Sequence, residues 1–457
     1  MNQPGRVLFA PSPNWYGAHM SCLFSSENVT FVAYCGQRSI VVLAIDSLDS
    51  RGRHAFRVHQ VLPGYNARTS CVACHVAGDE GELYLVTASQ DKCVQTWVLR
   101  CPEGDRGEAN QTGGESGGGR DAMQEKEGGD AVDGLREETL VVGCGGDEPA
   151  RQPFFSRHRV MSKRPAEVKA AVSDCSGSVL LGDVKGNVFQ WRLGEHGSRI
   201  QRVASSIGRG VVTMACLEGV RGIVVVGCAD GIVRFVRYAA TQDSCDEGLG
   251  EVLAEIGSEG ATIDGIGIHG LACAKTSGDV HWVASGLSGG RVRVDEVILA
   301  DGDGGVGGAD NGGLTAKVRR RVVELDMLRL ATCMNRSGKK SSKEKHGTRF
   351  WGSLAWGRVG TRLCLLTEGF GGGILAWWGL EDIVTEDGLP RHQTLPESHS
   401  RAIFRICTGS MDSGALMVTS IGLDRTCSVW RLLPMADVRK ELPAKLVSRL
   451  VGLGAHP

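Results

Sequence analysis

Residues 182–191 read Gly-Asp-Val-Lys-Gly-Asn-Val-Phe-Gln-Trp. A short turn rich in Gly, Asp and Asn leads into residues that alternate between apolar and polar up to Trp191. Turns of this composition join the two strands of a hairpin, and alternation with a period of two is typical of a half-buried strand. The stretch therefore predicts a β-hairpin that ends near a tryptophan.

The same pattern recurs along the chain at intervals of about 40 to 55 residues, with wider gaps where insertions intervene. Its versions lie at residues 34–45, 89–97, 182–191, 227–236, 285–294, 368–378 and 421–430. A single blade of this kind cannot bury both of its faces, so the set must close into a ring. The sequence predicts an all-β fold, a WD-repeat β-propeller of about seven blades over residues 1–433, although the Gly-His and Trp-Asp dipeptides of regular repeats are mostly absent.

Three segments that interrupt the repeats are predicted to be disordered. Residues 102–134 are rich in Gly, Glu and Asp with almost no apolar content, residues 301–313 are similar, and residues 338–346 are basic. Residues 434–457 form a predicted tail. Its apolar residues lie at helical spacing interrupted by Pro443, which predicts a short helix packed outside the ring.

Composition narrows the function classes. Among 457 residues, 51 Lys and Arg balance 52 Asp and Glu, so the formal net charge of -1 draws the chain neither to nucleic acid nor to membrane as a whole. No stretch reaches the roughly 18 apolar residues that span a bilayer, which predicts no membrane partner. The 16 cysteines are scattered through strand-like runs and are predicted to be reduced thiols of an intracellular protein.

Among sequence motifs that could indicate catalysis, a single cysteine motif resembles a cofactor-attachment site. Cys71-Val-Ala-Cys74-His75 matches the spacing of covalent haem attachment, but within an alternating strand the two cysteines point to opposite faces and are predicted to be small core residues. The sequence has no phosphate-binding loop, no H-E-x-x-H motif and no serine elbow of the G-x-S-x-G type, which requires a strand-to-helix turn. We therefore predict no enzyme, no cofactor and no metal site.

Four aspartates fall at the predicted hairpin turns, at what reads as the same repeat position in each. They are Asp91, Asp183, Asp230 and Asp424. Aspartate side chains accept hydrogen bonds from backbone amides in turns, so these residues are predicted to form the turns and not a carboxylate cluster.

Aromatic and arginine residues form the remaining candidate set. It comprises Trp15 and Tyr16, Trp351 in Arg349-Phe-Trp351, Arg401 and Phe404 in His399-Ser-Arg-Ala-Ile-Phe404, and Arg425. Flat rings and guanidinium groups suit stacked bases and phosphates. By composition alone, packing between blades explains them better.

The run Pro11-Ser-Pro-Asn-Trp-Tyr16, followed by Arg38-Ser-Ile-Val41, resembles the start of the Gemin-five family of RNA-binding WD-repeat proteins. The resemblance continues in order through residues 182–189, 226–233, 349–356, 370–377 and 400–404. It implies the first of that family's two propellers, and so binding of the Sm site and the 7-methylguanosine cap of spliceosomal small nuclear RNA for Sm-core assembly. The implied partners are small nuclear RNA and subunits of the survival-of-motor-neuron complex, in the cytoplasm and nucleus.

The same resemblance implies the residues that contact RNA. They are Asn14, Trp15, Tyr16, Arg38, Trp351, Arg401, Phe404 and Arg425. Two features depart from the family pattern: Gly267 stands where an acidic base-reading residue is expected, with Asp264 nearby, and the sequence ends at Pro457 before a second propeller. The alternative function is a WD-repeat scaffold that binds proteins and has no affinity for RNA.

Overall fold

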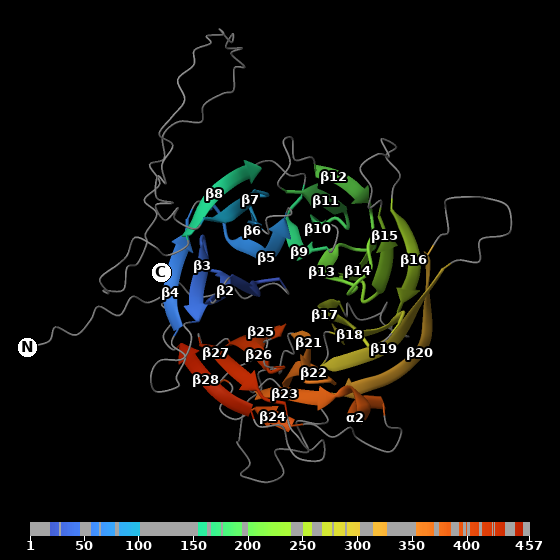
Figure 1. Ribbon diagram of the computed structural model, residues 1–457. Coiled ribbons are helices and arrows are strands. Elements are labelled where there is room, and N and C mark those ends of the chain that lie inside the picture. Colours follow the sequence, from blue (N-terminus) through green and yellow to red (C-terminus); the bar gives the residue numbers. More distant parts are fainter. Residues whose placement is uncertain are drawn as a thin grey trace, which may run out of the picture.

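The computed structural model is a ring of seven four-stranded antiparallel sheets, each built from four strands that follow one another in the chain (Figure 1). It is a seven-bladed WD-type β-propeller, which confirms the predicted fold class. The structure describes residues 19–26, 29–45, 56–63, 65–77, 82–100, 154–161, 166–174, 177–193, 200–238, 250–257, 267–276, 278–287, 290–301, 314–326, 353–369, 374–384, 393–395, 399, 403–410, 414–422, 424, 426–434 and 444–450.

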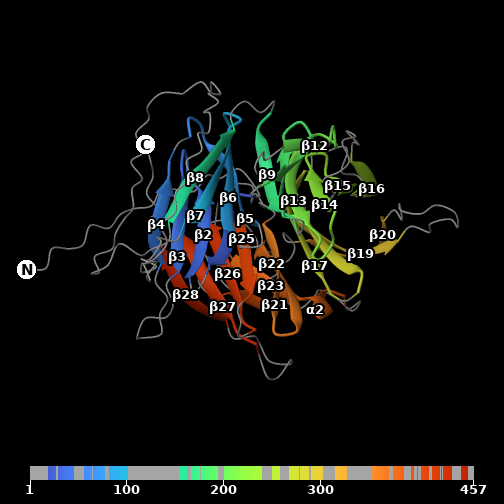
Figure 2. The ribbon, with the colours of Figure 1, turned by 45° about the horizontal axis from the view of Figure 1, so that its top comes forward.

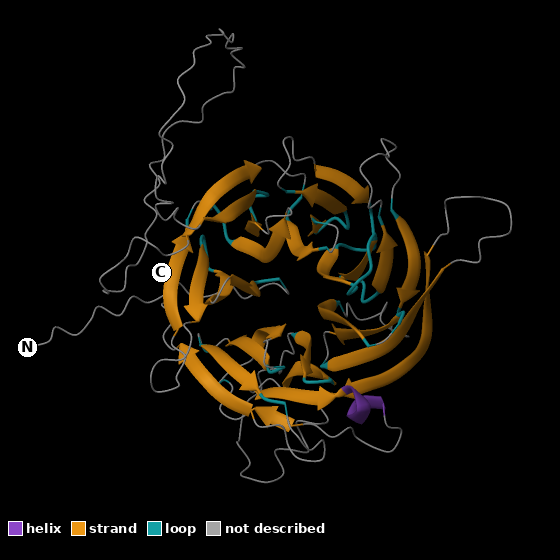
Figure 3. Ribbon diagram, viewed as in Figure 1, coloured by secondary structure: helices purple, strands orange, loops and turns teal. Residues whose placement is uncertain are grey.

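Within these residues, strands make up nearly all of the regular structure, and the short helix α2 (Leu380–Val384) lies on the outside of the ring (Figure 3). The described part of the chain holds no helix of the length and apolar character needed to cross a lipid bilayer.

The strands of blades 1 to 4 are β1 (Ser21–Ser26), β2 (Val29–Cys35), β3 (Ile40–Ile45), β4 (Phe56–Leu62); β5 (Thr69–Ala77), β6 (Glu82–Ser89), β7 (Val94–Arg100), β8 (Phe154–Met161); β9 (Val168–Ser173), β10 (Ser178–Asp183), β11 (Val188–Arg192), β12 (Ile200–Ala204); β13 (Val211–Cys216), β14 (Ile223–Cys228), β15 (Val233–Arg237) and β16 (Glu251–Ile256). Those of blades 5 to 7 are β17 (Ile268–Lys275), β18 (Val280–Leu287), β19 (Arg291–Asp301), β20 (Leu314–Asp326); β21 (Leu354–Val359), β22 (Arg362–Gly369), β23 (Ile374–Gly379), β24 (Gln393–Leu395); β25 (Ile403–Ser410), β26 (Leu416–Gly422), β27 (Cys427–Leu432) and β28 (Ala444–Leu450).

The first strand of each blade lies next to the axis of the ring and the fourth lies at its rim (Figure 2). Each of the seven predicted hairpins coincides with the second and third strands of one blade, from β2 and β3 to β26 and β27. The repeat count and the blade positions read from the sequence are thus confirmed.

Neighbouring blades are held together by apolar side chains that alternate along each strand. In β14, Val224 and Val226 pack against blade 3, whereas Val225 between them packs against blade 5. Both faces of each sheet are covered in this way, because successive side chains of a strand point to opposite faces. This packing explains why the strands read as nearly continuous apolar runs.

Blade 7 meets blade 1 without any exchange of strands among those described. Phe404 and Met417 of blade 7 instead join the apolar cluster of blade 1, and Gly409 faces Leu23. We call this interface the ring seam. Its described contacts come from side-chain packing and a few hydrogen bonds.

The tail prediction is wrong in part. Residues 444–450 form strand β28, which pairs with β27 as the outer strand of blade 7, for example Trp430 with Leu446. Helical spacing over so few residues does not distinguish helix from strand, and pairing satisfies the backbone groups at the open edge of β27. The propeller therefore extends past residue 433. The predicted insertions at 102–134, 301–313 and 338–346 lie outside the described residues, except that Asp301 is the last residue of strand β19.

Candidate functional site

One end of the propeller, which we call the turn face, carries the turns between the second and third strands together with the links between blades. Backbone hydrogen bonds join the two kinds of segment. The amide of Thr69 donates to the carbonyl of Gln37 at 3.0 Å, and that of Ile207 donates to the carbonyl of Gly186 at 2.8 Å. In the described part of blades 1 to 4, hydrogen bonds therefore join the turns to the links.

The turn aspartates accept backbone hydrogen bonds, as predicted. The donors, at 2.8–3.1 Å, are the amides of Cys93 to Asp91, Lys185 and Asn187 to Asp183, Ile232 to Asp230, and Thr426 to Asp424. The prediction that all four aspartates occupy the same repeat position is wrong for Asp183 of blade 3. Asp183 closes its turn by bonding to Asn187, as Ser89 does with Cys93, so Lys185 stands where Asp91 stands in blade 2.

Arg68 is exposed on the turn face between blades 1 and 2, where it makes contacts of its own. The other exposed cations on the described turn face of blades 1 to 4 are Arg38, Lys92, Lys185 and Arg209, which we call the turn-face cations. None of them forms an ion pair with a residue that the structure describes. Of the acidic groups nearby, Asp230 pairs with Arg234 at 2.9 Å, and Asp91 and Asp183 accept backbone amides but keep their charge, so the cations outnumber the unpaired carboxylates. The turn face therefore presents a net positive charge along this arc.

The opposite face differs in its charge pairing. Arg100 pairs with Glu82 at 3.5 Å, Arg237 with Glu251 at 3.1 Å, and Arg362 with Asp382 at 2.6 Å. These three cations have acidic partners within the fold.

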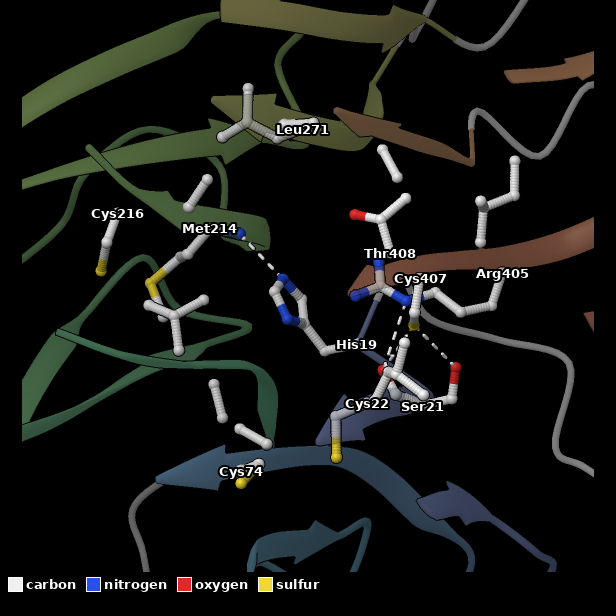
Figure 4. A pocket seen from close by; sticks show the side chains of 18 of the residues that line it. His19, Ser21, Cys22, Cys74, Met214, Cys216, Leu271, Arg405, Cys407 and Thr408 are labelled. Carbon is white, nitrogen blue, oxygen red and sulfur yellow. Dashed lines mark hydrogen bonds between the residues drawn. The ribbon is translucent and has the colours of Figure 1, made fainter. Parts of the chain in front are cut away.

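A cavity of about 420 Å³ lies on the axis, lined by the first strands of all seven blades (Figure 4). Its lining is mostly small, neutral side chains. By hydrogen-bond register, one tier comprises Cys74, Ser173, Cys216, Cys273 and Thr408 at equivalent positions of their strands. Burial raises the pKa of Cys74 to about 12 and also raises the pKa of Cys22 and Cys273, so these thiols carry no charge at neutral pH.

His19 crosses the cavity from the segment before β1. Its Nε2 accepts hydrogen bonds from the Met214 amide at 3.0 Å and from the Thr213 hydroxyl at 3.2 Å, both on blade 4 (Figure 4). Burial, and next the charge of Arg405, lowers the pKa of His19 to about 3, against an opposing backbone hydrogen bond at Ala171. The ring is therefore neutral, with its proton on Nδ1 and its Nε2 lone pair held by blade 4.

Only two of the residues implied to contact RNA are described. Arg38 is exposed on the turn face. Phe404 is 5% exposed and packs in the ring seam, so its ring does not face solvent. Asn14, Trp15, Tyr16, Trp351, Arg401 and Arg425 lie outside the described residues, as does Asp264; Gly267 is buried at the start of blade 5.

Cys71 and Cys74 point to opposite faces, as predicted. Cys71 is buried between blades 2 and 3, and Cys74 packs toward blade 1 and lines the cavity. His75 is engaged through Nδ1, which lies 2.7 Å from the Ser173 hydroxyl. No group of three or more His, Cys, Asp or Glu that could hold a metal ion occurs among the residues that the structure describes.

A hydrogen-bonded set in blade 7 superficially resembles a hydrolase triad. Nδ1 of His399 lies 3.1 Å from Asp424 Oδ1, and Nε2 lies 2.8 Å from Ser420 Oγ. The Trp430 indole also donates to Ser420 Oγ at 3.4 Å. The His399 and Ser420 side chains are fully buried, so no substrate can reach the hydroxyl, and the set stabilises the blade.

Comparisons with known proteins give a distant likeness. No protein-family model and no curated protein matches the sequence. Among solved structures, Sqt1 from Chaetomium thermophilum matches at 13% identity over 97% of this chain and 90% of that chain, with a TM-score of 0.49. Sqt1 from Saccharomyces cerevisiae matches at 13% identity over 96% of each chain, with a TM-score of 0.45.

A further structure shows the Chaetomium protein bound to the N-terminus of the ribosomal protein L10, at 13% identity, 97% and 91% coverage and a TM-score of 0.47. A likeness this distant does not indicate a shared partner. The resemblance to the Gemin-five family is confirmed by none of these comparisons and stays a prediction.

Proposed function

We propose that this propeller is a non-catalytic scaffold that binds an extended acidic segment of a partner protein across its turn face. The observation that carries the proposal is the arc of turn-face cations without acidic partners among the described residues. Charge that a fold does not neutralise internally is available to a partner of opposite sign, which it also steers during encounter.

The neutral overall charge supports a local site and not a general affinity for anions. With a formal net charge of -1, the chain as a whole offers a polyanion no attraction. Within the part of the chain that the structure describes, the turn face is where cations outnumber free carboxylates. A segment that follows the arc would meet Arg38, Lys92, Lys185 and Arg209 in turn.

A protein partner fits the described turn face better than RNA does. Single-stranded RNA is held by aromatic side chains that stack on its bases as well as by cations. Every aromatic side chain whose burial the structure describes is buried except Phe154, which lies on the opposite face. Contact of RNA with Trp15, Tyr16 and Trp351 stays a prediction from the family resemblance.

Matched neutralisation of the two faces tests the proposal. The turn-face variant combines Arg38→Gln, Lys92→Gln, Lys185→Gln and Arg209→Gln; the control combines Arg100→Gln, Arg192→Gln, Arg221→Gln and Arg237→Gln near the opposite face. Both variants lose four positive charges, and the control also breaks the exposed ion pairs of Arg100 with Glu82 and of Arg237 with Glu251. Fluorescence anisotropy with fluorescein-labelled decaglutamate, and separately decauridylate, measures binding.

We expect the wild-type chain to bind decaglutamate with an affinity that falls as salt rises, and the turn-face variant to bind it at least about 10-fold more weakly. The control variant should bind like the wild type. Equal losses in the two variants would contradict a site on the turn face. If the chain binds decauridylate tightly and does not bind decaglutamate, the partner at the turn face is RNA and not an acidic protein segment.

A further inference from the structure

We propose that the axial cavity is a carboxylate site, in which Arg405 pairs with an acidic side chain of the bound segment. This inference rests on the proposed function, because it assigns the second contact of the same partner. It extends the binding site from the turn face into the propeller axis.

Arg405 is an unusual residue for its position. By hydrogen-bond register with the second strand, its equivalents are Cys71 in β5, Ala170 in β9, Thr213 in β13 and Gly270 in β17. A small side chain occupies the position in each of these blades. Blade 7 alone in this set places a long cation there, directed across the cavity toward His19 (Figure 4).

Arg405 is also the only charged side chain that lines the described cavity. Its Nε donates to the Ser21 carbonyl at 3.3 Å across the ring seam, and no ion pair joins it to a described residue. That bond orients the guanidinium while leaving the terminal nitrogens for another acceptor. A planar guanidinium presents parallel N–H groups that match the two oxygens of a carboxylate.

The cavity holds no counter-charge of its own. Its described lining contains no Asp or Glu, and its buried thiols Cys22, Cys74 and Cys273 are protonated. His19 is neutral with its Nε2 occupied by blade 4. A cation in such surroundings interacts strongly with an anion, because few other dipoles or charges screen it.

The position of Arg405 allows a side chain to reach it from the turn face. β25 starts at that face with Ile403, and Arg405 is two residues further along, about 7 Å at the usual rise per residue. A cavity of about 420 Å³ has room for one acidic side chain and ordered water. A Glu of a segment lying across the mouth would meet the guanidinium of Arg405 within the cavity.

The test titrates labelled decaglutamate into the wild-type chain and into Arg405→Gln, Arg405→Lys and Arg358→Gln. Arg358 is the control, since it is also a half-buried arginine of a first strand but does not line the cavity and bonds to the Lys275 carbonyl. We expect Arg405→Gln to weaken binding about 10- to 100-fold, the size of one charged hydrogen-bonded contact. The affinity of Arg405→Lys should lie between those of the wild type and Arg405→Gln, because lysine keeps the positive charge but lacks the planar guanidinium.

The outcomes separate this inference from the proposed function. If Arg405→Gln binds decaglutamate as tightly as the wild type while the turn-face variant loses binding, the carboxylate site is overturned. The proposal of a partner at the turn face would then still stand. No binding of decaglutamate by the wild-type chain would overturn both.

A second measurement uses only the wild-type chain, in case Arg405→Gln disturbs the ring seam. Alkylation of Cys74 and Cys273 by N-ethylmaleimide is followed by mass spectrometry with and without saturating decaglutamate. Both thiols line the cavity, so an inserted acidic side chain should slow their reaction, whereas decaglutamine should not. Unchanged alkylation at saturation would overturn the inference.

Discussion

The ring seam and the junction between blades 3 and 4 hold neighbouring blades together by different means. At the junction, a described link runs from β12 to β13, and its residues Ile207 and Gly210 hydrogen-bond to turns of blades 3 and 4. At the seam, the described contacts are the packing of residues such as Phe404 and three polar contacts at Ser21, one with Arg405 and two with Cys407. The seam therefore depends on side chains where the junction also has backbone bonds.

This difference bears on how candidate functional residues are interpreted. Phe404, which the family resemblance places in an RNA site, contributes to the seam as a buried core residue. Arg405 beside it faces the cavity from the same interface. Adjacent residues of one strand thus differ in their surroundings. Phe404 packs in the apolar cluster of blade 1, whereas Arg405, which follows it at a bulge of β25, donates to the Ser21 carbonyl and lines the cavity.

The largest expected effect is on the seam. Phe404→Ala should destabilise the fold by about 3 to 5 kcal/mol, the usual cost of removing a buried phenylalanine. Phe189→Ala is the matched variant, since Phe189 is 6% exposed and packs between blades 2 and 3. Hydrogen exchange should show faster opening of β1 and β25 in Phe404→Ala and no such local opening in Phe189→Ala.

The same pair of variants distinguishes a structural Phe404 from an RNA-contacting one. If unfolding and exchange of Phe404→Ala match the wild type while RNA binding is lost, Phe404 belongs to a binding site. Equal exchange patterns in the two variants would show that the seam is no weaker than an interface with a covalent link.

A second prediction concerns His19, whose hydrogen bonds join the segment before β1 to blade 4. This contact crosses the ring from blade 1, beside the seam, to the opposite side. The pKa of His19 is about 3 in the fold, against an ordinary 6.5 when unfolded. The unfolded chain therefore binds the proton first, and stability that is complete above pH 6.5 is lost as the pH falls toward 3. At pH 5 the loss amounts to about 2 kcal/mol.

Urea unfolding of the wild type and His19→Asn at pH 7.5 and pH 5 measures this effect. The asparagine amide can accept the Met214 hydrogen bond but does not titrate. Burial also lowers the pKa of His75, His269 and His281, so both proteins should lose stability at pH 5. The wild type should lose about 2 kcal/mol more; an identical loss would show that His19 is not held neutral by the fold.

The sequence predicts what is encoded locally. The seven hairpins, the backbone bonds of Asp91 and Asp424, and the opposite orientations of Cys71 and Cys74 all follow from turn chemistry and a period of two. The prediction that Asp183 shares the turn position of Asp91 and Asp424 is wrong. Polar residues stand at both ends of this turn, Asp183 and Asn187, and the repeat pattern does not show which turn position each of them occupies.

The cavity could not be predicted in this way, because His19, Met214 and Arg405 come from positions spread over most of the chain. A signal for Arg405 does exist. Alignment of the first strands shows an arginine where other blades have Cys, Ala, Thr or Gly, but the alignment needs the strand registers that only the structure supplies. The outer strand β28 was missed for a similar reason, since its partner β27 decides its conformation.

The smallest expected effect compares equivalent tryptophans in blades 7 and 3. The Trp430 indole donates to Ser420 Oγ at 3.4 Å, whereas the buried Trp191 indole N–H has no hydrogen-bond partner among the described residues. The reason lies in β10, where Leu181 occupies the position that Ser420 holds in β26. Trp430→Phe and Trp191→Phe should lose similar packing, but only the former loses a hydrogen bond and leaves the buried Ser420 network incomplete.

We therefore expect Trp430→Phe to cost about 1 kcal/mol more than Trp191→Phe, measured by urea unfolding of both variants. Ser420→Ala supplies the control, because in that background Trp430→Phe should cost no more than Trp191→Phe does in the wild type. Equal costs in the wild type would mean that the blade 7 network adds no net stability over the apolar packing of blade 3. The remaining His399 bonds to Asp424 and Thr426 would then fix the conformation of the turn. In that case the polar network of blade 7 would determine the shape of the turn face without adding to the stability of the fold.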